Sequence, residues 1–344
     1  MPTPRSRLVD VAKTLWYHCI SRCVRRAFLC GEGREHRKQW IEHRLKELVD
    51  IFAIQCAGFS IMDNHLHLLL RLDSEIASDW SSEEVARRWF GLYPLRDDSG
   101  EAMAVTEARV ARFAADAGWV AEMRRRLGDL GWFMKCLKEP LARLANQEDG
   151  CTGAFWEGRY KSIAVLDEES LLATAAYIDL NPVAAGISPT PEDSDYTSLR
   201  TRITHCQASG TAETLLEDDA LMTRNSAQEA GLWLLPVDDN RTHGGERPGL
   251  HEGLTLSCYL RSVDASSRMI RAGKASLEAD MAPIFQRLGL DQQLLESTVA
   301  GLFEPRPRIS NRLGRKPNLD HAASTHSGGR VRGKPPSLQL QLAR

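Results

Sequence analysis

Two histidines separated by one residue are the sharpest chemical feature of the sequence. His65 and His67 lie in the apolar run MDNHLHLLL. If this run is a strand, both imidazoles project from one face of a sheet while Leu66 points to the other. Two imidazoles on one face can chelate a divalent metal, and the alternative is a pair of half-buried strand histidines. Burying both without a partner would be costly, which favours the metal.

A tyrosine and an asparagine four residues apart form a second candidate group. Tyr177 and Asn181 would be neighbours on one face of a helix. The small residues 173–176 leave the Tyr177 hydroxyl room to approach a bulky substrate, and Asn181 offers a carbonyl oxygen to a metal. Taken alone, such a tyrosine is more often a core or surface residue, and asparagine before Pro182 is more often a turn former.

Aromatic and basic residues alternate in the segment AFWEGRYKS. Aromatic rings stack on exposed bases, and arginine and lysine contact phosphates, so the segment indicates nucleic-acid binding. An ordinary amphipathic strand is the alternative, and an earlier arginine cluster could either extend such a surface or form a solvated face. The candidate DNA-binding residues are Arg22, Arg25, Arg26, Trp156, Arg159, Tyr160 and Lys161.

Strand and helix patterns in the first part of the chain surround the histidine pair. Residues 15–22 are rich in β-forming types, and residues 35–50 place apolar side chains at helical spacing. Two β-rich runs, 51–62 and 65–72, are separated by the turn signal Asp63-Asn64. This arrangement predicts a hairpin, or one bent strand pair, that carries both histidines.

Helical patterns dominate from residue 73 onward. Residues 73–128 are interpreted as an inserted helical segment, and residues 132–148 as an amphipathic helix kinked at Pro140. A strand pattern over 155–166 precedes a helix over 168–181, which has acidic residues in its first turn and stops at an Asn-Pro pair. The elements together predict an α+β fold.

The composition is that of a globular protein with an uneven charge. The 344 residues are 42% hydrophobic and 26% charged, which excludes disorder of the whole chain. A net charge of −2 argues against a protein surface that is basic throughout. The charge is uneven, however: residues 305–344 hold nine basic residues and one acidic residue, Asp320, which gives them a charge of +8 and leaves residues 1–304 with −10. This tail is expected to be disordered and to add sequence-independent affinity for phosphates.

Targeting signals and cysteine spacing give the expected compartment. The N-terminal segment lacks a secretory pattern, and no run approaches the roughly 18 apolar residues of a membrane span. The eight cysteines include no C-x-x-C pair, so free thiols are favoured over a disulfide framework or a structural zinc site. We therefore expect a cytoplasmic, nucleoid-associated protein with no membrane partner.

The order and spacing of three segments resemble a known enzyme family. The segments are YHCISRCVRRAFLCG, MDNHLHLLL and FWEGRYKSIAVLDEESLLATAAYIDLNPVAAGI. The series is similar to the single-tyrosine HUH transposases, and within them to the REP-associated tyrosine transposases, over roughly residues 14–72 and 130–204. The most specific piece is YIDLNPVAAG, because the family closes its catalytic helix with a tyrosine, an asparagine four residues on and an N-P-V-x-A-G turn.

This resemblance implies a fold, a site and a reaction. The fold is an antiparallel sheet with flanking helices and a ferredoxin- or RRM-like core. Tyr177 looks like the nucleophile, while His65, His67 and Asn181 look like ligands of Mg²⁺ or Mn²⁺. The implied enzyme cleaves and rejoins single-stranded DNA, guided by hairpin elements, through a 5′-phosphotyrosine. Asp63 stands where the family commonly has proline, and the insertion is longer than the connection in compact members.

The resemblance covers the expected catalytic part, and the sequence patterns give the rest of the expected organisation. Residues 1–204 form the catalytic domain with an insertion at about 73–128, residues 205–304 form a mostly helical, acidic region, and residues 305–344 form the basic tail. The helical region could bind DNA, dock a second protomer as a homodimer, or brace the core. Two alternatives remain: a non-catalytic nucleic-acid-binding protein that retains the fold, and a histidine-metal hydrolase using Asp63 or Asp179.

Overall fold

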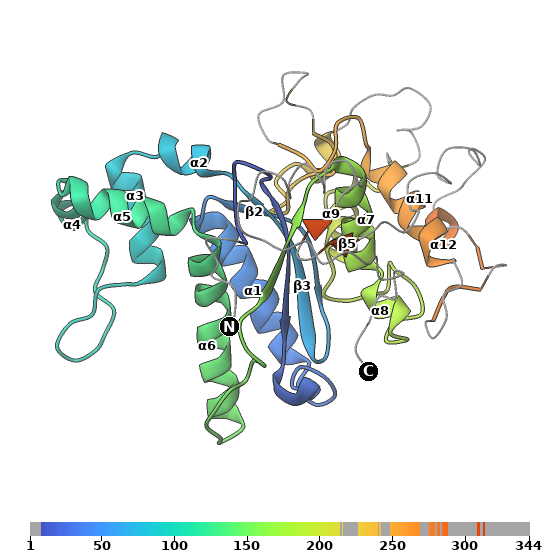
Figure 1. The fold of residues 1–344 in the computed structure, drawn as a ribbon, viewed down its shortest axis with the longest axis horizontal. Helices are drawn as coiled ribbons and strands as arrows, with labels where there is room; N and C mark the ends of the chain where they lie inside the picture. Colours follow the sequence, from blue (N-terminus) through green and yellow to red (C-terminus); the bar gives the residue numbers. More distant parts are fainter. Residues whose placement is uncertain are drawn as a thin grey trace.

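The protein, described here as a computed structural model, combines a β-sheet with helices on both faces, an α+β fold (Figure 1). The structure describes residues 8–213, 215, 226–239, 241, 248–268, 275–278, 281–282, 284–287, 308–309 and 312–313. The strands are β1 (Trp16–Arg22), β2 (Ile54–Ile61), β3 (His65–Leu72), β4 (Lys161–Val165), β5 (Arg308–Ile309) and β6 (Arg312–Leu313). The helices are α1 (His36–Ile51), α2 (Ser74–Asp79), α3 (Ser82–Leu92), α4 (Glu107–Ala114), α5 (Ala117–Leu127), α6 (Leu130–Glu148), α7 (Glu168–Asp179), α8 (Asn181–Ala184), α9 (Ser198–Ala208), α11 (Leu256–Ser267) and α12 (Ile284–Arg287), with short 3-10 turns η2 (Val24–Arg26) and η3 (Ser226–Glu229).

The sheet has the strand order β2-β3-β1-β4-β6-β5, and β2, β3, β1 and β4 are antiparallel to their neighbours among these four. The predicted strand at 15–22 is confirmed as β1, and the predicted hairpin is confirmed as β2 and β3 joined at Asp63-Asn64. The predicted strand over 155–166 is shorter, because only Lys161–Val165 forms β4.

The central strand β3 distributes its buried residues between two cores. Leu66, Leu68 and Leu70 belong to the core shared with α1 and α6, whereas Leu69 belongs to the core shared with α7 and α9. Figure 1 shows these two helix layers on opposite sides of the sheet. Because residues two apart on a strand share a face, His65 and His67 lie on the same face as Leu69, toward α7.

The inserted segment between β3 and α6 is helical, as predicted. Figure 1 shows α2 to α5 projecting to one side of the sheet. Ser81 begins α3 by accepting a hydrogen bond from the backbone N–H of Glu84, which is a typical N-cap. Phe90 and Val110 form a small core of their own between α3 and α4. The insertion therefore has a small core of its own, and Val85 and Leu127 also join it to the core on the α1 and α6 side of the sheet.

Two prolines act differently on their helices. The helix α6 runs through Pro140 as one element, so this residue does not end it as an interior proline often does. By contrast, α7 ends at Asp179, and α8 begins with Pro182 in its first turn, where the missing N–H costs no helical bond. The helix predicted over 168–181 is confirmed as α7, but it ends two residues earlier, at Asp179, and Asn181 and Pro182 begin α8.

A buried carboxylate joins the C-terminal region to α7. Asp179 Oδ1 accepts hydrogen bonds from Ser198 Oγ at 2.5 Å and Leu199 N at 2.9 Å, at the start of α9. Its Oδ2 accepts from the Tyr259 hydroxyl of α11 at 2.6 Å. Burial raises the pKa of Asp179, and these donors oppose that shift. Three helices are thus fixed at one side chain.

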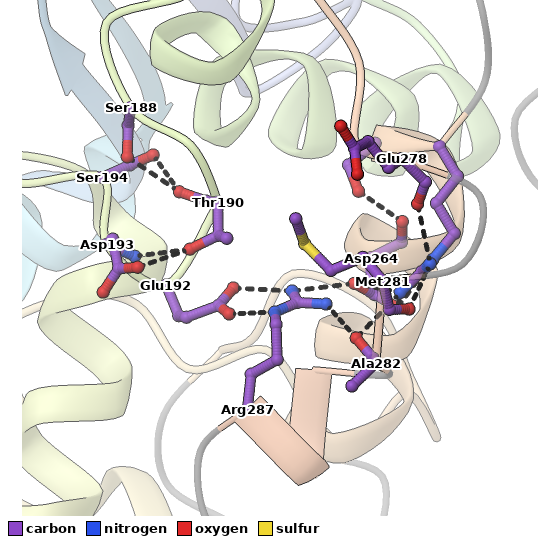
Figure 2. Close-up of polar contacts among 12 residues, drawn as sticks. Ser188, Thr190, Glu192, Asp193, Ser194, Asp264, Glu278, Met281, Ala282 and Arg287 are labelled. Atoms are coloured by element: carbon purple, nitrogen blue, oxygen red, sulfur yellow. Dashed lines mark hydrogen bonds and ion pairs between the residues drawn. The ribbon is translucent and has the colours of Figure 1, made fainter.

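A second polar cluster holds α11 and α12 against the loop that follows α8 (Figure 2). The Arg287 guanidinium contacts Glu192 Oε2 at 2.8 Å and Asp264 Oδ1 at 2.9 Å, and all three side chains are largely buried. Thr190 Oγ1 donates to Asp193 Oδ2 at 2.8 Å and shapes the loop. In the described residues, the C-terminal region therefore packs on the sheet-bearing part as a brace.

The C-terminal predictions need partial correction. The segment 231–239 contains no helix, so the described part of 205–304 is less helical than expected. This segment passes beside β2, where Leu235 N donates a hydrogen bond to the Cys56 carbonyl at 2.8 Å. In the tail, β5 and β6 pair with each other, and β6 runs parallel to β4. The rest of the predicted disordered tail lies outside the described residues. Within the parts described, no helix has the length and apolarity needed to span a bilayer.

We expect Tyr259→Phe to lower the free energy of unfolding by about 1–3 kcal/mol, because a buried carboxylate loses one of its donors. Chemical denaturation measures the change. Tyr93→Phe is the matched control: Tyr93 is 39% exposed and its hydroxyl contacts only a sulfur, Cys136 Sγ at 3.3 Å, among the bonds described, so its loss is smaller. Equal losses in the two variants would contradict this role of Tyr259.

Candidate active site

Both predicted histidines lie on one face of β3, as the alternation of strand side chains requires. The ring centroids of His65 and His67 are 4.9 Å apart and their planes meet at 74°. In the antiparallel pairing of β1 with β3, His67 is opposite Ile20 and His65 is opposite Arg22. His65 is half-buried, whereas His67 is buried with 1% of its surface exposed. The pair thus spans the boundary between the interior and the solvent.

A third imidazole, His18 of β1, completes the group and was not predicted. His18 Nε2 is hydrogen-bonded to His67 Nδ1 at 2.8 Å, and the two rings stack at a centroid distance of 5.1 Å. His18 is also buried. Its signal in the sequence is its place in an alternating strand, but the contact depends on the register of two strands 49 positions apart. Sequence reasoning had no means to fix that register.

The turn residue Asn64 fixes which nitrogen of His65 carries the proton. Asn64 Nδ2 donates to the carbonyl of Arg26 at 3.1 Å, so its Oδ1 is left as an acceptor. That oxygen lies 2.6 Å from His65 Nδ1, which must therefore be the protonated nitrogen. The lone pair of His65 is then on Nε2, the arrangement that a ligating histidine uses.

His67 presents a nitrogen that suits a bound cation. When Nδ1 donates in the bond to His18, the lone pair of His67 is on Nε2. This Nε2 is buried and has no hydrogen-bond partner among the described residues, which is costly for a polar atom unless a ligand completes it. Burial, with the charges of His18, His65 and Arg22 adding to it, holds the pKa of His67 well below its ordinary value of 6.5. The imidazole is therefore neutral, as metal ligation requires.

Tyr177 reaches the histidines from the facing helix α7. Its ring centroid lies 5.6 Å from that of His67 and 6.1 Å from that of His18, with edge-to-face geometry in both pairs. Tyr177 is half-buried, while the small residues Ala175 and Ala176 pack into the core beneath α7. One strand pair and one helix therefore bring three imidazoles and a phenol to the same face of the sheet.

Asn181 is buried one turn beyond Tyr177, at the start of α8. Its Nδ2 donates to the carbonyls of Tyr177 at 2.9 Å and Ile178 at 3.4 Å, so the amide nitrogen caps the end of α7. The carbonyl oxygen Oδ1 is the part of the side chain that could ligate a cation. Among the described residues, no three side chains of His, Cys, Asp or Glu are grouped to hold a metal, so a third ligand of another type would be needed.

The two carboxylates near the histidines have other partners. Asp63 forms an ion pair with Lys38 Nζ at 2.7 Å, and its backbone carbonyl accepts from Cys30 N at 2.8 Å. Asp179 is committed to Ser198, Leu199 N and Tyr259 as described above. The alternative of a histidine-metal hydrolase that uses either carboxylate therefore gains no support from the geometry.

The predicted DNA-binding residues divide into exposed cations and buried rings. Trp156 and Tyr160 are each only 8% exposed and belong to the core on the α6 side of the sheet, so the prediction that they stack on bases is wrong in this structure. The Trp156 indole N–H donates to the Lys138 carbonyl at 3.0 Å, which satisfies it inside the protein. Arg22 is half-buried, and the exposed members are Arg25, Arg26, Arg159 and Lys161.

Comparisons with known proteins give one likeness to a solved structure. It is described as "Structure of the REP associates tyrosine transposase bound to a REP hairpin", and the two chains are 13% identical with a TM-score of 0.33. The likeness covers 55% of this chain and 78% of that chain. No family model matches the chain, and no curated protein matches it.

We expect His67 to stay neutral below pH 6.5 when a chelator is present, because its pKa lies well below that value. The unfolded chain, with a histidine pKa of about 6.5, then binds a proton that the folded chain does not, so the free energy of unfolding falls as the pH drops below about 6.5. An NMR titration of the imidazole nitrogens measures the midpoint. A midpoint at or above 6.5 would show that burial does not act on His67 as described.

Proposed function

We propose that the protein is a metal-dependent enzyme that cleaves and rejoins single-stranded DNA through a covalent tyrosine–DNA link. The observation that carries this proposal is the meeting of Tyr177 with His65 and His67 on one face of the sheet, since the chemistry requires a nucleophile beside a cation site. The ring contacts between Tyr177 and His67, and between His65 and His67, support it.

The residues present suit a Mg²⁺ or Mn²⁺ ion. His65 and His67 would supply Nε2 atoms, and Asn181 would supply Oδ1. Two features favour this role: each histidine has its Nδ1 in a hydrogen bond, and His67 Nε2 is buried without a partner among the described atoms. Imidazole with one amide oxygen suits Mn²⁺ as well as Mg²⁺. When bound, the ion would polarise the scissile phosphate and stabilise the charge that develops on it.

Tyr177 would act as the nucleophile. A phenol with a pKa near 10 is a weak nucleophile at neutral pH, so its position beside the phosphate matters more than its basicity. The phenolic oxygen loses its proton and bonds to phosphorus, while the bond from phosphorus to the 3′ oxygen breaks and that oxygen gains a proton. The products are a 5′-phosphotyrosine and a free 3′-OH. Because one phosphate ester replaces another, rejoining needs no nucleotide cofactor.

Basic residues on this side of the molecule would hold the DNA backbone. Arg22 stands opposite His65 on the neighbouring strand, and its Nε is buried without a hydrogen-bond partner among the described residues. Arg25, Arg26, Arg159 and Lys161 are exposed. Arginine forks match phosphate oxygens in geometry and charge, so these side chains fit a single-stranded or hairpin DNA substrate.

We expect Tyr177→Phe to abolish a covalent protein–DNA adduct and to leave DNA binding within about twofold of the unchanged protein, because only the nucleophilic oxygen is removed. A denaturing gel with end-labelled single-stranded hairpin DNA and Mg²⁺ or Mn²⁺ measures the adduct. Tyr160→Phe is the control, since this ring is buried in the opposite core, and it keeps the adduct. An adduct that persists in Tyr177→Phe would assign the nucleophile elsewhere. Binding without any adduct in the unchanged protein would favour the non-catalytic alternative.

We expect removal of divalent ions with a chelator to eliminate the adduct and added Mn²⁺ to restore it. His67→Ala should weaken Mn²⁺ binding by at least about tenfold, because the site loses a ligand. Titration calorimetry with Mn²⁺ measures the affinity directly. His43→Ala is the control, since the His43 side chain is 76% exposed on α1. Unchanged Mn²⁺ affinity in His67→Ala would remove the metal site from the proposal.

A further inference from the structure

The loop between β1 and α1 exposes an aromatic ring, and the loop itself is attached to the turn that precedes the histidines. Phe28 is 66% exposed, more than any other large hydrophobic residue described in the structure. Arg25 and Arg26 are also exposed and lie in the same loop. Single exposed apolar residues are common on protein surfaces, so exposure alone assigns nothing to Phe28. Two further features of the loop indicate that it binds a ligand.

The first feature is backbone strain. Arg25 and Arg26 have φ angles of 55° and 57°, in the left-handed region that residues with a Cβ rarely occupy. Two such residues in succession persist only where their surroundings hold them, and such positions concentrate at ligand-binding sites. Here the Arg26 carbonyl accepts from Asn64 Nδ2, and Ala27 N donates to the Val24 carbonyl at 3.1 Å.

The second feature is the attachment of this loop to the turn that precedes the histidine pair. Cys23 N donates to the Asn64 carbonyl and Cys30 N to the Asp63 carbonyl, both at 2.8 Å. Gly31 lies between this turn and Phe28, because a Cβ added to it would meet Asp63 Cβ at 3.1 Å and Phe28 Cβ at 3.2 Å. The Phe28 side chain therefore leaves the backbone next to the point where the loop contacts the turn. The backbone that carries Arg26 and Phe28 is therefore attached to the turn that leads to His65.

We propose that the loop from Arg25 to Phe28 binds the unpaired DNA beside the cleaved bond. The Phe28 ring stacks on one base, and Arg25 and Arg26 contact the phosphates that flank it. This inference rests on the proposed function and names the part of the chain that holds the substrate strand. An unpaired base is the fitting occupant, because stacking on a projecting ring needs a base with an open face, and duplex DNA covers its base faces. The adjacent cations match the phosphates on either side.

Binding of oligo(dT), in a chelator so that no cleavage occurs, tests the inference. Fluorescence anisotropy gives the affinity for oligo(dT) and for an abasic strand of equal length, which keeps the phosphates and lacks the bases. We expect Phe28→Ala to weaken oligo(dT) binding by about 5- to 150-fold and to leave the affinity for the abasic strand unchanged. Phe28→Trp should restore oligo(dT) binding. Arg25→Ala should weaken both strands equally, because it removes a phosphate contact.

The control variant Ile187→Ala removes another exposed apolar side chain, 48% exposed after α8, and should leave both affinities unchanged. If the unchanged protein binds oligo(dT) and Phe28→Ala behaves as Ile187→Ala does, the role of Phe28 is overturned while the proposed function stands. If Phe28→Ala weakens both strands alike, the ring acts on loop structure and the stacking inference is also overturned. If the unchanged protein binds neither strand nor hairpin DNA, the proposed function itself fails.

Discussion

The register between β1 and β3 is the constraint on which the site depends. A shift of one residue would turn every side chain of a strand to the opposite face. Leu66, Leu68 and Leu70 are buried in the α1 and α6 core, and this burial fixes which residues of β3 face α7. With this face buried and β1 paired to β3 in the observed register, the His67 ring lies within hydrogen-bond distance of His18. Apolar packing on one face of the sheet therefore positions polar chemistry on the other.

The position of α7 depends on polar contacts that lie away from the imidazoles. Asp179 follows Tyr177 by two residues and points to the opposite side of the helix, where α9 and α11 supply its hydrogen bonds. Arg287 joins α12 to the loop that follows α8 through Glu192, and to α11 through Asp264. The described C-terminal segments thus brace the helix that carries the tyrosine. Of the three roles expected for residues 205–304, these contacts favour the brace.

Much of the local structure could be predicted from the sequence, because it follows from periodicity and end signals. The strand with His65 and His67, the helix with Tyr177 and the stop at Pro182 all follow from patterns within about a dozen residues. Contacts across long separations could not be predicted in this way. His18 depends on strand pairing, and the burial of Trp156 and Tyr160 depends on where β4 begins and on the position of α6. The metal ligands, the nucleophile and the DNA contacts of the arginines and Lys161 remain predictions.

The two hydrogen bonds of the Asn64 amide have a consequence for the His65 ring. The same planar group donates to the Arg26 carbonyl and accepts from His65 Nδ1, so the conformation of the loop and the tautomer of the ring are linked. If the Arg26 carbonyl turned away, the amide could rotate and present its NH₂ to the ring, which would favour a proton on Nε2 instead. By reciprocity, a cation on Nε2 favours the strained form of the loop. The carbonyl of Arg26, which takes no part in the chemistry, thereby determines which nitrogen of His65 carries the proton.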